Sequence, residues 1–434
     1  MTPLAIGALG IVALLGLILL QVPIGFAMII VGVVGYALQA GWGPALTILA
    51  SEPSGLLASV DLATVPLFLL MGTFASAAGF SRDVYSAAAA LLGHRRGGLA
   101  YATIGGCAAF GAVCGSSTAT AATFAKAALP EMLRRGYAEG FSTGTIAAGG
   151  TLKSLIPPSI VMILYCIVSR TFIFDLFIAA LVPALLVIAL NLVTIWIIVR
   201  LHPAVAPTAE RTSWSETRAA LKAALPVLLL MISVFGGLYS GVFTVNEAAS
   251  VAAVLSLLFA VARGRLSLEA LWEGLRESAG ATAMIYIIII GASVFTYLIT
   301  LARVPEALIG LVGSFQVPPL VIIFSLLVAY LILGAVFDEI SAMLITLPFV
   351  LPIIEKLGYD AIWWGILNVV VIELGMIIPP IGIIVFVLHG LAPKISLGTI
   401  YRGVTPFIIA DLVLLALLTL FPEISLWLPR TLKV

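Results

Sequence analysis

Two interrupted apolar segments hold the residue types best suited to chemistry. The first, AAGGTLKSLIPPSI (147–160), places two glycines, a lysine and a proline pair inside a stretch otherwise apolar enough for a membrane helix. The second, IELGMIIPPIG (372–382), places an acid, a glycine and another proline pair in the same setting. The first helix is expected to break about Gly149, Gly150, Pro157 and Pro158, and the second about Gly375, Pro379 and Pro380. Because proline has no N–H donor and blocks continuation of a helix, each break leaves carbonyl groups unpaired. Hydrocarbon cannot satisfy these groups, so we expect both breaks to face the protein interior.

A polar turn is expected to accompany each break. One turn reads CGSSTATAAT (114–123) and is rich in hydroxyls, and the other reads VFDEISAM (336–343) and is acidic. Hydroxyl and carbonyl oxygens suit a small alkali cation, and half-helix N-termini offer partial positive charge to an anion. The sequence therefore predicts a site for a cation together with a carboxylate.

The candidate residues are paired between the two halves of the chain. The first half offers Gly115, Ser116, Ser117, Thr118, Thr120, Gly149, Gly150, Thr151, Lys153, Pro157 and Pro158. The second half offers Asp338, Glu339, Ser341, Glu373, Gly375, Pro379 and Pro380. Serine and threonine in membrane helices often bond only to their own backbone, and proline often only kinks a helix. The pairing of hydroxyl-rich turns with broken helices favours a binding site over that simpler interpretation.

Charged residues within membrane segments are candidates for function because burying them is costly. Lys153 has two alternative roles: it binds the carboxylate of a substrate, or it pairs permanently with an acid such as Glu373. Snorkelling of its ammonium group to the membrane surface is a further alternative.

Composition defines the class of protein. The chain is 62% hydrophobic and only 9% charged, against about 25% charged in a typical soluble domain. The many long apolar stretches predict an all-α polytopic membrane protein, whose first stretch is a retained membrane helix and not a cleaved signal. A net charge of +1 suggests no nucleic-acid partner. Three isolated cysteines, three scattered histidines and the absence of hydrolase, metalloenzyme or ATPase motifs argue against an enzyme with an organic cofactor.

An internal repeat organises the sequence. Three motif pairs recur at one constant offset: Leu129-Pro130 and Leu351-Pro352, Gly136-Tyr137 and Gly358-Tyr359, and Ile156-Pro157-Pro158 and Ile378-Pro379-Pro380. Stretches 98–130 and 317–354 exceed the roughly 20 residues of a single crossing, so each is predicted to be a re-entrant hairpin. This topology places most basic residues on one side, which the positive-inside rule makes cytoplasmic. The hairpins then open from opposite faces, as in the inverted-topology repeats of secondary transporters.

The predicted organisation follows this repeat. The transport domain is predicted in two halves. Half 1 is 62–169, with hairpin 98–130 and broken helix 139–169, and half 2 is 280–391, with hairpin 317–354 and broken helix 361–391. The scaffold is predicted to comprise the N-terminal helices 1–61, the helices 170–279 with a cytoplasmic linker 200–222, and a C-terminal helix 392–434. Stretch 4–39 forms either two short crossings or one long kinked helix. The basic segments GHRRGG (93–98) and RGRLSLEALWEGLRES (263–278) are expected to be interfacial, with plain cytoplasmic loops as the alternative.

These motifs resemble one transporter family. GSSTATAATFAKAALPEMLRRGY, AAGGTLKSLIPPSI and FDEISAMLITLPFVLPIIEKLGY are similar to the hairpin and broken-helix motifs of the large membrane subunit of tripartite ATP-independent periplasmic (TRAP) transporters. The resemblance implies an elevator-type transporter of the bacterial inner membrane that imports an organic acid on a sodium gradient. It also implies two partners, a small four-helix membrane subunit and a periplasmic substrate-binding protein.

By similarity, sodium would bind at Ser116, Ser117, Thr118 and the backbone of 149–151 in one half, and at the 338–341 tip with the backbone of 375–379 in the other. The chain departs from the family pattern at Lys153 and Ser154, where small or apolar residues are common, and at Ile378, where threonine is common. The main alternative function is a stand-alone sodium- or proton-coupled dicarboxylate symporter. A channel is a further alternative, although paired broken helices suit alternating access better.

Overall fold

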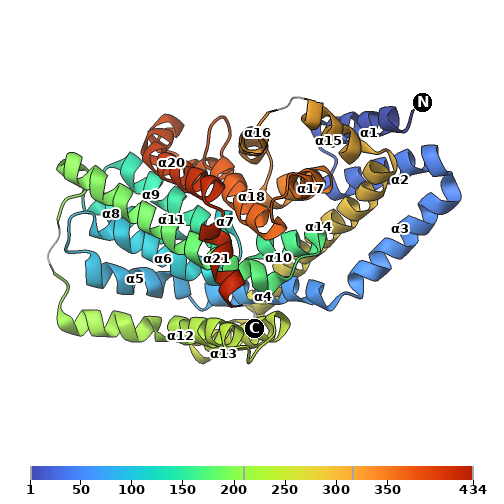
Figure 1. Ribbon diagram of the computed structural model, residues 1–434. Helices are drawn as coiled ribbons and strands as arrows, with labels where there is room; N and C mark the ends of the chain where they lie inside the picture. The colour runs from blue at the N-terminus through green and yellow to red at the C-terminus, as the bar shows by residue number, and fades with distance from the viewer. Residues whose placement is uncertain (1, 209–210, 315–316, 433–434) are drawn as a thin grey trace.

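The chain folds as a bundle of helices (Figure 1). The computed structural model describes residues 2–208, 211–314 and 317–432, and within these ranges every regular element is a helix. Among the described residues, seven helices are long and apolar enough to cross a membrane: Val60–Ala77, Ile173–Leu201, Trp214–Tyr239, Val245–Ala262, Leu268–Leu301, Pro319–Val336 and Leu397–Leu420. An eighth candidate is the pair Glu139–Leu155 and Ile160–Ser169, bent by 40° at its break. The prediction of an all-α multi-pass membrane protein is confirmed.

The N-terminal stretch 4–39 forms two helices. Helix α1 (Pro3–Leu19) ends before a turn in which Gln21 has a positive φ of 64°, and α2 (Ile24–Ala40) starts after Pro23. Each helix has 17 residues, the short end of the range for a membrane crossing. The structure therefore has two separate helices here and not one long kinked helix, and their crossing of the membrane stays a prediction. A third helix, α3 (Trp42–Leu57), follows stretch 4–39 within the predicted scaffold range 1–61 and was not itself predicted.

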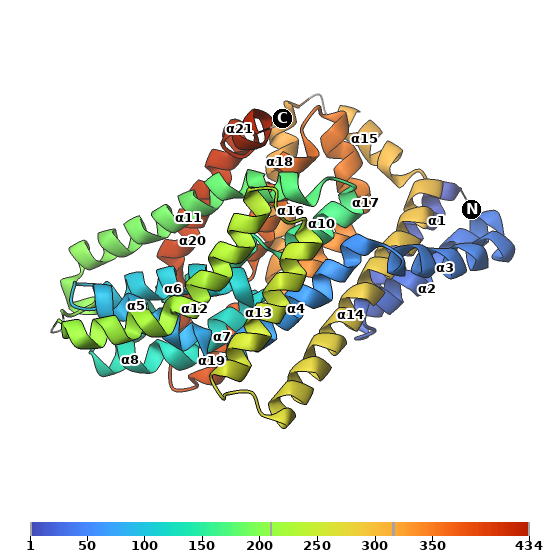
Figure 2. The same cartoon turned by 90° about the horizontal axis from the view of Figure 1, so that it is seen from below.

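Glycines set the distance between α2 and α14 (Leu268–Leu301). A Cβ atom added to Gly25 would lie 2.7 Å from the backbone of Ile287, and one added to Gly35 would lie 2.6 Å from Leu298. Small residues allow helix backbones to approach closely within a membrane, where water does not drive association. The N-terminal helices are therefore packed against the C-terminal half of α14, as Figure 2 shows.

The first half contains the predicted hairpin and an additional helix before it. Its elements are α4 (Val60–Ala77), α5 (Phe80–Leu92), α6 (Gly98–Cys114), α7 (Ser117–Ala127), α8 (Leu129–Arg134), α9 (Glu139–Thr151), the 3-10 helix η1 (Leu152–Leu155) and α10 (Ile160–Ser169). Helices α6 and α7 form the hairpin predicted at 98–130, with its turn at Gly115, which has a φ of 72°. Helix α5 was not predicted, and the basic segment GHRRGG forms the turn between α5 and α6.

The first helix break lies later in the sequence than predicted. Gly149 and Gly150 are helical residues of α9, and the chain leaves helical conformation only at 156–159, around the cis Pro157-Pro158 bond. A Cβ atom on Gly149 would lie 2.6 Å from Cys107 Sγ, and one on Gly150 would lie 2.9 Å from Ala121 Cβ. These glycines therefore allow α9 to pack tightly on the hairpin, and the prediction that they unwind the helix was wrong.

The connection between the halves is more helical than predicted. It comprises α11 (Ile173–Leu201), the short η2 (Pro203–Val205), α12 (Trp214–Tyr239) and α13 (Val245–Ala262). The predicted linker 200–222 is irregular only in part, because α12 starts at Trp214 with a capping box between Ser213 and Glu216. This reciprocal cap satisfies backbone donors that the first helical turn leaves free.

The second half repeats the pattern of hairpin and broken helix. Its elements are α14 and then α15 (Val304–Ser314), α16 (Pro319–Val336), α17 (Glu339–Lys356), α18 (Ala361–Gly375), α19 (Ile383–Leu391), α20 (Leu397–Leu420) and α21 (Glu423–Thr431). Helices α16 and α17 form the predicted second hairpin, and α18 and α19 flank the cis Pro379-Pro380 bond. The basic segment 263–278, predicted to be interfacial or a plain cytoplasmic loop, belongs from Leu268 onward to the 34-residue α14.

Helix α20 lies directly against α9. A Cβ atom on Gly403 would lie 1.8 Å from the carbonyl oxygen of Gly140, and one on Gly144 would lie 2.1 Å from the carbonyl oxygen of Gly403. Helix α20 also contacts α11 and α18, and α11 contacts α6. Helices α11 and α20 thus contact the broken helices, and the grouping of 170–279 and 392–434 as scaffold stays a prediction.

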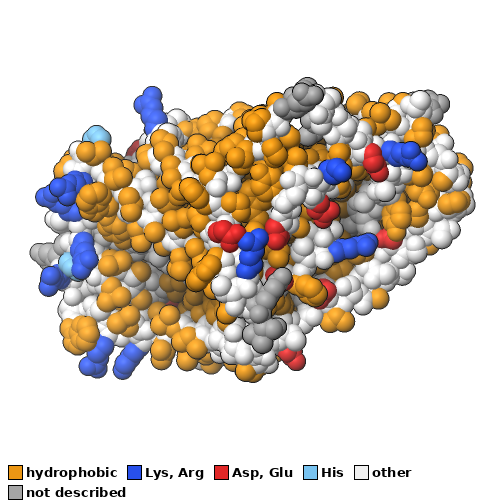
Figure 3. Space-filling view, in the orientation of Figure 1, with side chains coloured by type: hydrophobic (Ala, Val, Ile, Leu, Met, Phe, Trp, Pro, Cys, Tyr) orange, Lys and Arg blue, Asp and Glu red, His pale blue; other side chains and the backbone are white. Residues whose placement is uncertain are grey.

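The surface shown in Figure 3 is largely hydrophobic, as expected of a protein surrounded by lipid. Hydrophobic side chains cover most of the face shown, and many Lys and Arg side chains gather at the end where the α5–α6 turn, α8 and the end of α11 lie (Figures 1 and 3). Arg95, Arg96, Arg134 and Arg200 are exposed. An apolar belt with basic residues at one end is the distribution expected of a multi-pass membrane protein.

We expect one ion-pair cluster at this basic end to make stability depend on pH. Glu131 accepts hydrogen bonds from Arg135 Nε at 2.7 Å and from Arg134. Burial raises the pKa of Glu131, but the hydrogen bonds from both arginines outweigh burial and hold the pKa below its usual value. The stabilisation is therefore present above the unfolded pKa of about 4.3 and is lost as pH falls through the lower folded pKa.

The measurement compares thermal unfolding of the wild type and Glu131→Gln in detergent. At pH 7 the variant should be less stable by about 0.5 kcal/mol, because the pairs are partly exposed. The difference should disappear near pH 3. An equal difference at both pH values would contradict the prediction.

Candidate functional site

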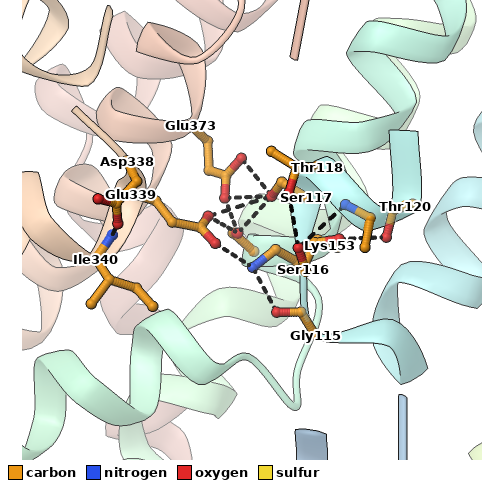
Figure 4. Close-up of polar contacts among 12 residues, drawn as sticks. Gly115, Ser116, Ser117, Thr118, Thr120, Lys153, Asp338, Glu339, Ile340 and Glu373 are labelled. Carbon is orange, nitrogen blue, oxygen red and sulfur yellow. Dashed lines mark hydrogen bonds and ion pairs between the residues drawn. The ribbon is translucent and has the colours of Figure 1, made fainter. Parts of the chain in front are cut away.

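The tips of the two hairpins meet at the centre of the molecule (Figures 1 and 4). Helix α7 begins at this point with Ser116 as its N-cap, whose hydroxyl accepts a hydrogen bond from the Ala119 amide at 3.3 Å. Helix α17 begins with Asp338 as its N-cap, whose Oδ1 accepts from the amides of Ile340 and Ser341 at 3.2 and 3.1 Å. Both tips therefore present helix N-termini, which carry partial positive charge.

A buried ion pair joins the two halves at these tips. The Lys153 ammonium lies 3.1 Å from Glu339 Oε1 and donates to the carbonyl oxygen of Gly115 at 3.2 Å. The Lys153 side chain is 1% exposed and the Glu339 side chain is 12% exposed. Lys153 follows the end of α9, whereas Glu339 starts α17, so the pair connects the first broken helix to the second hairpin (Figure 4).

Two serine hydroxyls hold the second acid of the site. Ser117 Oγ lies 2.8 and 2.9 Å from the two carboxylate oxygens of Glu373, and Ser154 Oγ also donates to Glu373. The same hydroxyls approach Glu339 Oε2, Ser117 at 3.4 Å and Ser154 at 3.3 Å. Glu339, Glu373, Lys153, Ser117 and Ser154 thus form one connected network, which we call the central cluster.

The central cluster contains two acidic side chains and one basic side chain. The structure pairs the basic Lys153 with Glu339 and not with Glu373. Of the predicted alternatives for Lys153, the structure shows pairing with an acid, and the partner is Glu339, not Glu373, the example given above. Removing charges from water is unfavourable unless they are paired and hydrogen-bonded. Glu373 is therefore an acid whose side chain contacts hydroxyl groups and no basic group in the cluster.

The other predicted residues of the first half lie around the cluster in local structural roles. Thr118 Oγ1 lies 3.1 Å from Ser116 Oγ, and Thr120 Oγ1 donates to the Ser116 carbonyl at 2.8 Å. Thr151 Oγ1 donates to the Ala148 carbonyl at 2.8 Å. Each of these hydroxyls keeps lone pairs that a ligand can use. Their roles in binding remain predictions.

The other predicted residues of the second half likewise support its backbone. Asp338 caps α17, and Ser341 is buried in the first turn of that helix. Gly375 permits a close approach, since its Cβ atom would lie 2.6 Å from the carbonyl carbon of Gly334. The two proline pairs, Pro157-Pro158 and Pro379-Pro380, interrupt the two helices that carry Lys153 and Glu373.

Positions that are equivalent in the two halves of the repeat lie close together at the site but carry different side chains. At the offset of the proline pairs, Ser117 corresponds to Glu339 and Thr151 corresponds to Glu373. Where the first half has a hydroxyl, the second half has a carboxylate. The basic residue that balances one of these acids comes from the first half, so the site is complete only when both halves are folded together.

Two residues of this region were missed by the predicted site. Ser154 was noted only as a departure from the family pattern, yet it contacts both acids. Asp411 is an acid in the apolar helix α20 and is 5% exposed, and within the described part of the chain its Oδ1 atom has no hydrogen-bond partner. A cavity of about 20 Å³ lies between Asp411, Glu373 and Thr151, enough for one water molecule. The charge inside an apolar span was the signal available in the sequence.

The fold and the site define the class of protein. Broken helices and hairpin tips that meet at a buried polar site are features of secondary transporters, and the seven apolar spans place the chain in a membrane. The sequence model of one protein family, described as 'Tripartite ATP-independent periplasmic transporter, DctM component', matches residues 11–424 of this chain. The chain belongs to this TRAP transporter family and is a large permease subunit, not an enzyme. Its location is the bacterial inner membrane, which it crosses several times.

Individual relatives agree with this family. The C4-dicarboxylate TRAP transporter large permease protein DctM of Pseudomonas aeruginosa is 38% identical over 370 residues, 85% of this chain and 86% of the relative. The ectoine TRAP transporter large permease protein TeaC of Halomonas elongata is 31% identical over 420 residues, 96% of this chain and 97% of the relative. The chain is also similar in structure to the YdaH transporter of Alcanivorax borkumensis, whose crystal structure is described as having an unusual topology. The structural match covers 91% of each chain, with a TM-score of 0.62 and 17% sequence identity. At that identity the likeness concerns the fold.

Proposed function

We propose that this chain is the permease subunit of a sodium-gradient-driven, binding-protein-dependent importer of an organic acid. The coupling ion is Na⁺, and the site lies at the meeting of the two hairpin tips and the two broken helices. The observation that carries the proposal is the central cluster, in which polar groups of both halves surround two buried acids, of which only Glu339 has a basic partner. Buried ionisable groups in membrane segments mark ion and substrate pathways.

The chemistry of the tips supports a sodium site. Ser116, Ser117, Thr118 and Thr120 supply hydroxyl oxygens at the first tip, next to the carbonyl of Gly115. Hard oxygen donors of this kind bind small alkali cations, while the N-termini of α7 and α17 offer partial positive charge to a substrate carboxylate. We propose that both are bound close together, so that the cation lowers the electrostatic cost of the anion.

The proposed movement is of the elevator type. Helices α9 and α20 are in backbone contact at Gly140 and Gly403, so they are expected to move as one body with the hairpins that meet at the site. Alternating access in inverted-repeat transporters is largely a rigid-body movement of this kind. Helices α1 and α2 pack against each other and are proposed to remain fixed.

Two partners complete the proposed system. Members of the TRAP family work in general with a periplasmic substrate-binding protein and a small membrane subunit. We propose that this chain works with a separate four-helix subunit and a separate binding protein. The two relatives described above are named for a C4-dicarboxylate and for ectoine, so a panel of substrates is required.

The decisive experiment is uptake into liposomes that contain this chain and its small membrane partner. A panel of organic acids is offered with and without the cognate binding protein, under imposed sodium or proton gradients. Uptake that requires both sodium and the binding protein supports the proposal. Uptake by this chain alone, on either gradient, favours the stand-alone symporter.

Replacing Ser117 with alanine is expected to weaken sodium binding. The substitution removes the hydroxyl that contacts both oxygens of Glu373. A hydrogen bond to a charged group contributes about 1.5–3 kcal/mol, so the apparent sodium affinity should fall at least about tenfold. The sodium dependence of uptake at saturating substrate measures this change. Ser142→Ala is the matched control, because that buried hydroxyl bonds to Ala138 of its own helix; equal effects of both variants would contradict the prediction.

A further inference from the structure

The Lys153 ammonium occupies a position whose donor set would also suit a metal cation. Its two partners are oxygens, the Gly115 carbonyl at 3.2 Å and Glu339 Oε1 at 3.1 Å, and they come from the two hairpin tips. A backbone carbonyl and a carboxylate are ligands of the kind that coordinate sodium in broken-helix transporters. We infer that Lys153 is a built-in cation that takes the place of one coupling ion, an inference that rests on the proposed sodium coupling.

The surroundings of Lys153 have room for this side chain. A Cβ atom on Gly111 would lie 2.6 Å from Lys153 Cβ, so α6 passes the lysine with no side chain at that position. The ammonium group is fully covered, and both of its contacts are made within the protein. Lys153 is therefore held as a permanent part of the site.

The acidic and basic side chains of the central cluster determine how many sodium ions it is expected to bind. With Lys153 present, one basic group faces two acids and pairs with one of them, Glu339. Without it, Glu339 and Glu373 share the serine hydroxyls and neither acid has a basic partner in the cluster. Because an unpaired buried charge is strongly unfavourable, loss of the lysine should create a demand for one more cation.

The rival role for Lys153 is direct binding of the substrate carboxylate. For that role the ammonium must leave Glu339, and breaking a buried ion pair on one side costs about 3–5 kcal/mol. Lys153 links two elements of the protein, the end of the first broken helix and the start of α17. The geometry therefore favours charge replacement over substrate recognition.

The test compares two replacements of the lysine. Lys153→Ala removes the charge and opens space for an ion between the Gly115 carbonyl and Glu339. Lys153→Met removes the charge but keeps a side chain of similar length in that space. The third variant, K153A/E339Q, removes both charges of the ion pair. All variants are measured with the small membrane partner and the binding protein in liposomes, at zero membrane potential and a tenfold sodium gradient.

The expected result is a change in sodium stoichiometry for one variant. Lys153→Ala should couple one more sodium ion per substrate than the wild type, so that equilibrium accumulation rises about tenfold at that gradient and the sodium-to-substrate flux ratio rises by about one. Lys153→Met and K153A/E339Q should show no such increase. Because binding to the folded state raises stability, the melting temperature of Lys153→Ala should also depend more steeply on sodium than that of the wild type. This readout does not require transport.

The outcomes separate this inference from the proposed function. Uptake by the wild type without any sodium dependence overturns the proposed function and leaves no coupling ion for Lys153 to replace. A sodium-dependent wild type with unchanged stoichiometry and unchanged sodium-dependent melting in Lys153→Ala overturns the inference alone. A raised KM for substrate with unchanged sodium dependence in Lys153→Ala also overturns it, because that result assigns the lysine to the substrate.

Discussion

Glu339→Gln is expected to unfold at a much lower temperature than the wild type and to abolish uptake. The substitution leaves the Lys153 ammonium, which is 1% exposed, without the carboxylate 3.1 Å away. Breaking a buried ion pair on one side destabilises a protein by about 3–5 kcal/mol, because the remaining charge is buried without compensation. Thermal unfolding of the purified chain in detergent measures the stability, and uptake in liposomes measures the function.

A double substitution and a matched control make this prediction specific. In K153M/E339Q both charges are absent, so most of the lost stability should return, whereas uptake should remain low because the site has changed. Glu355→Gln removes an exposed acid near the other end of α17 and should melt like the wild type. If Glu339→Gln and Glu355→Gln melted at the same temperature, the Lys153–Glu339 pair would have no structural role.

Gly403→Ala is expected to give the largest loss of stability among single-methyl changes. The added Cβ atom would lie 1.8 Å from the carbonyl oxygen of Gly140, closer than any real contact. The obstacle is backbone and not a flexible side chain, so α9 and α20 must separate. Overpacking typically costs about 1–3 kcal/mol, and we expect a cost at or above about 3 kcal/mol here. The yield of folded protein and its melting temperature are the measurements.

Gly280→Ala is the control for this substitution. Gly280 is also within a helix, α14, but a Cβ atom there would meet nothing within 4 Å. Alanine has a higher helix propensity than glycine by about 0.8–1 kcal/mol, so the control should be neutral or slightly more stable. Gly403→Ala with a stability equal to that of Gly280→Ala would show that α9 and α20 do not pack as described.

Much of the fold could be predicted because its causes are local in sequence. Long apolar stretches must be helical in a membrane, since each backbone polar group needs an internal partner. The proline pairs at 157–158 and 379–380 interrupt helices wherever they lie, and the constant offset between the motifs reveals the repeat without coordinates. Helices α3 and α5 were missed because they are short or polar: α5 carries Ser, Arg and Asp in its first turn.

Positions that depend on packing between distant segments were predicted poorly. Gly149 and Gly150 suggested an unwound helix, but they keep α9 helical and in close contact with the hairpin. The role of a glycine, either flexibility or close approach, depends on which atoms lie next to it. No local pattern contains that information.

The sequence by itself determined that this protein is an all-helical membrane transporter subunit with two related halves and two polar breaks. Apolar length, proline chemistry and the repeated motifs are sufficient for that conclusion. Only the tertiary structure decided that Lys153 pairs with Glu339, that Ser117 and Ser154 hold Glu373, and that Asp411 lies behind the site. These contacts join residues far apart in the chain, and electrostatic partners are chosen by distance in space, which depends on how the two halves pack.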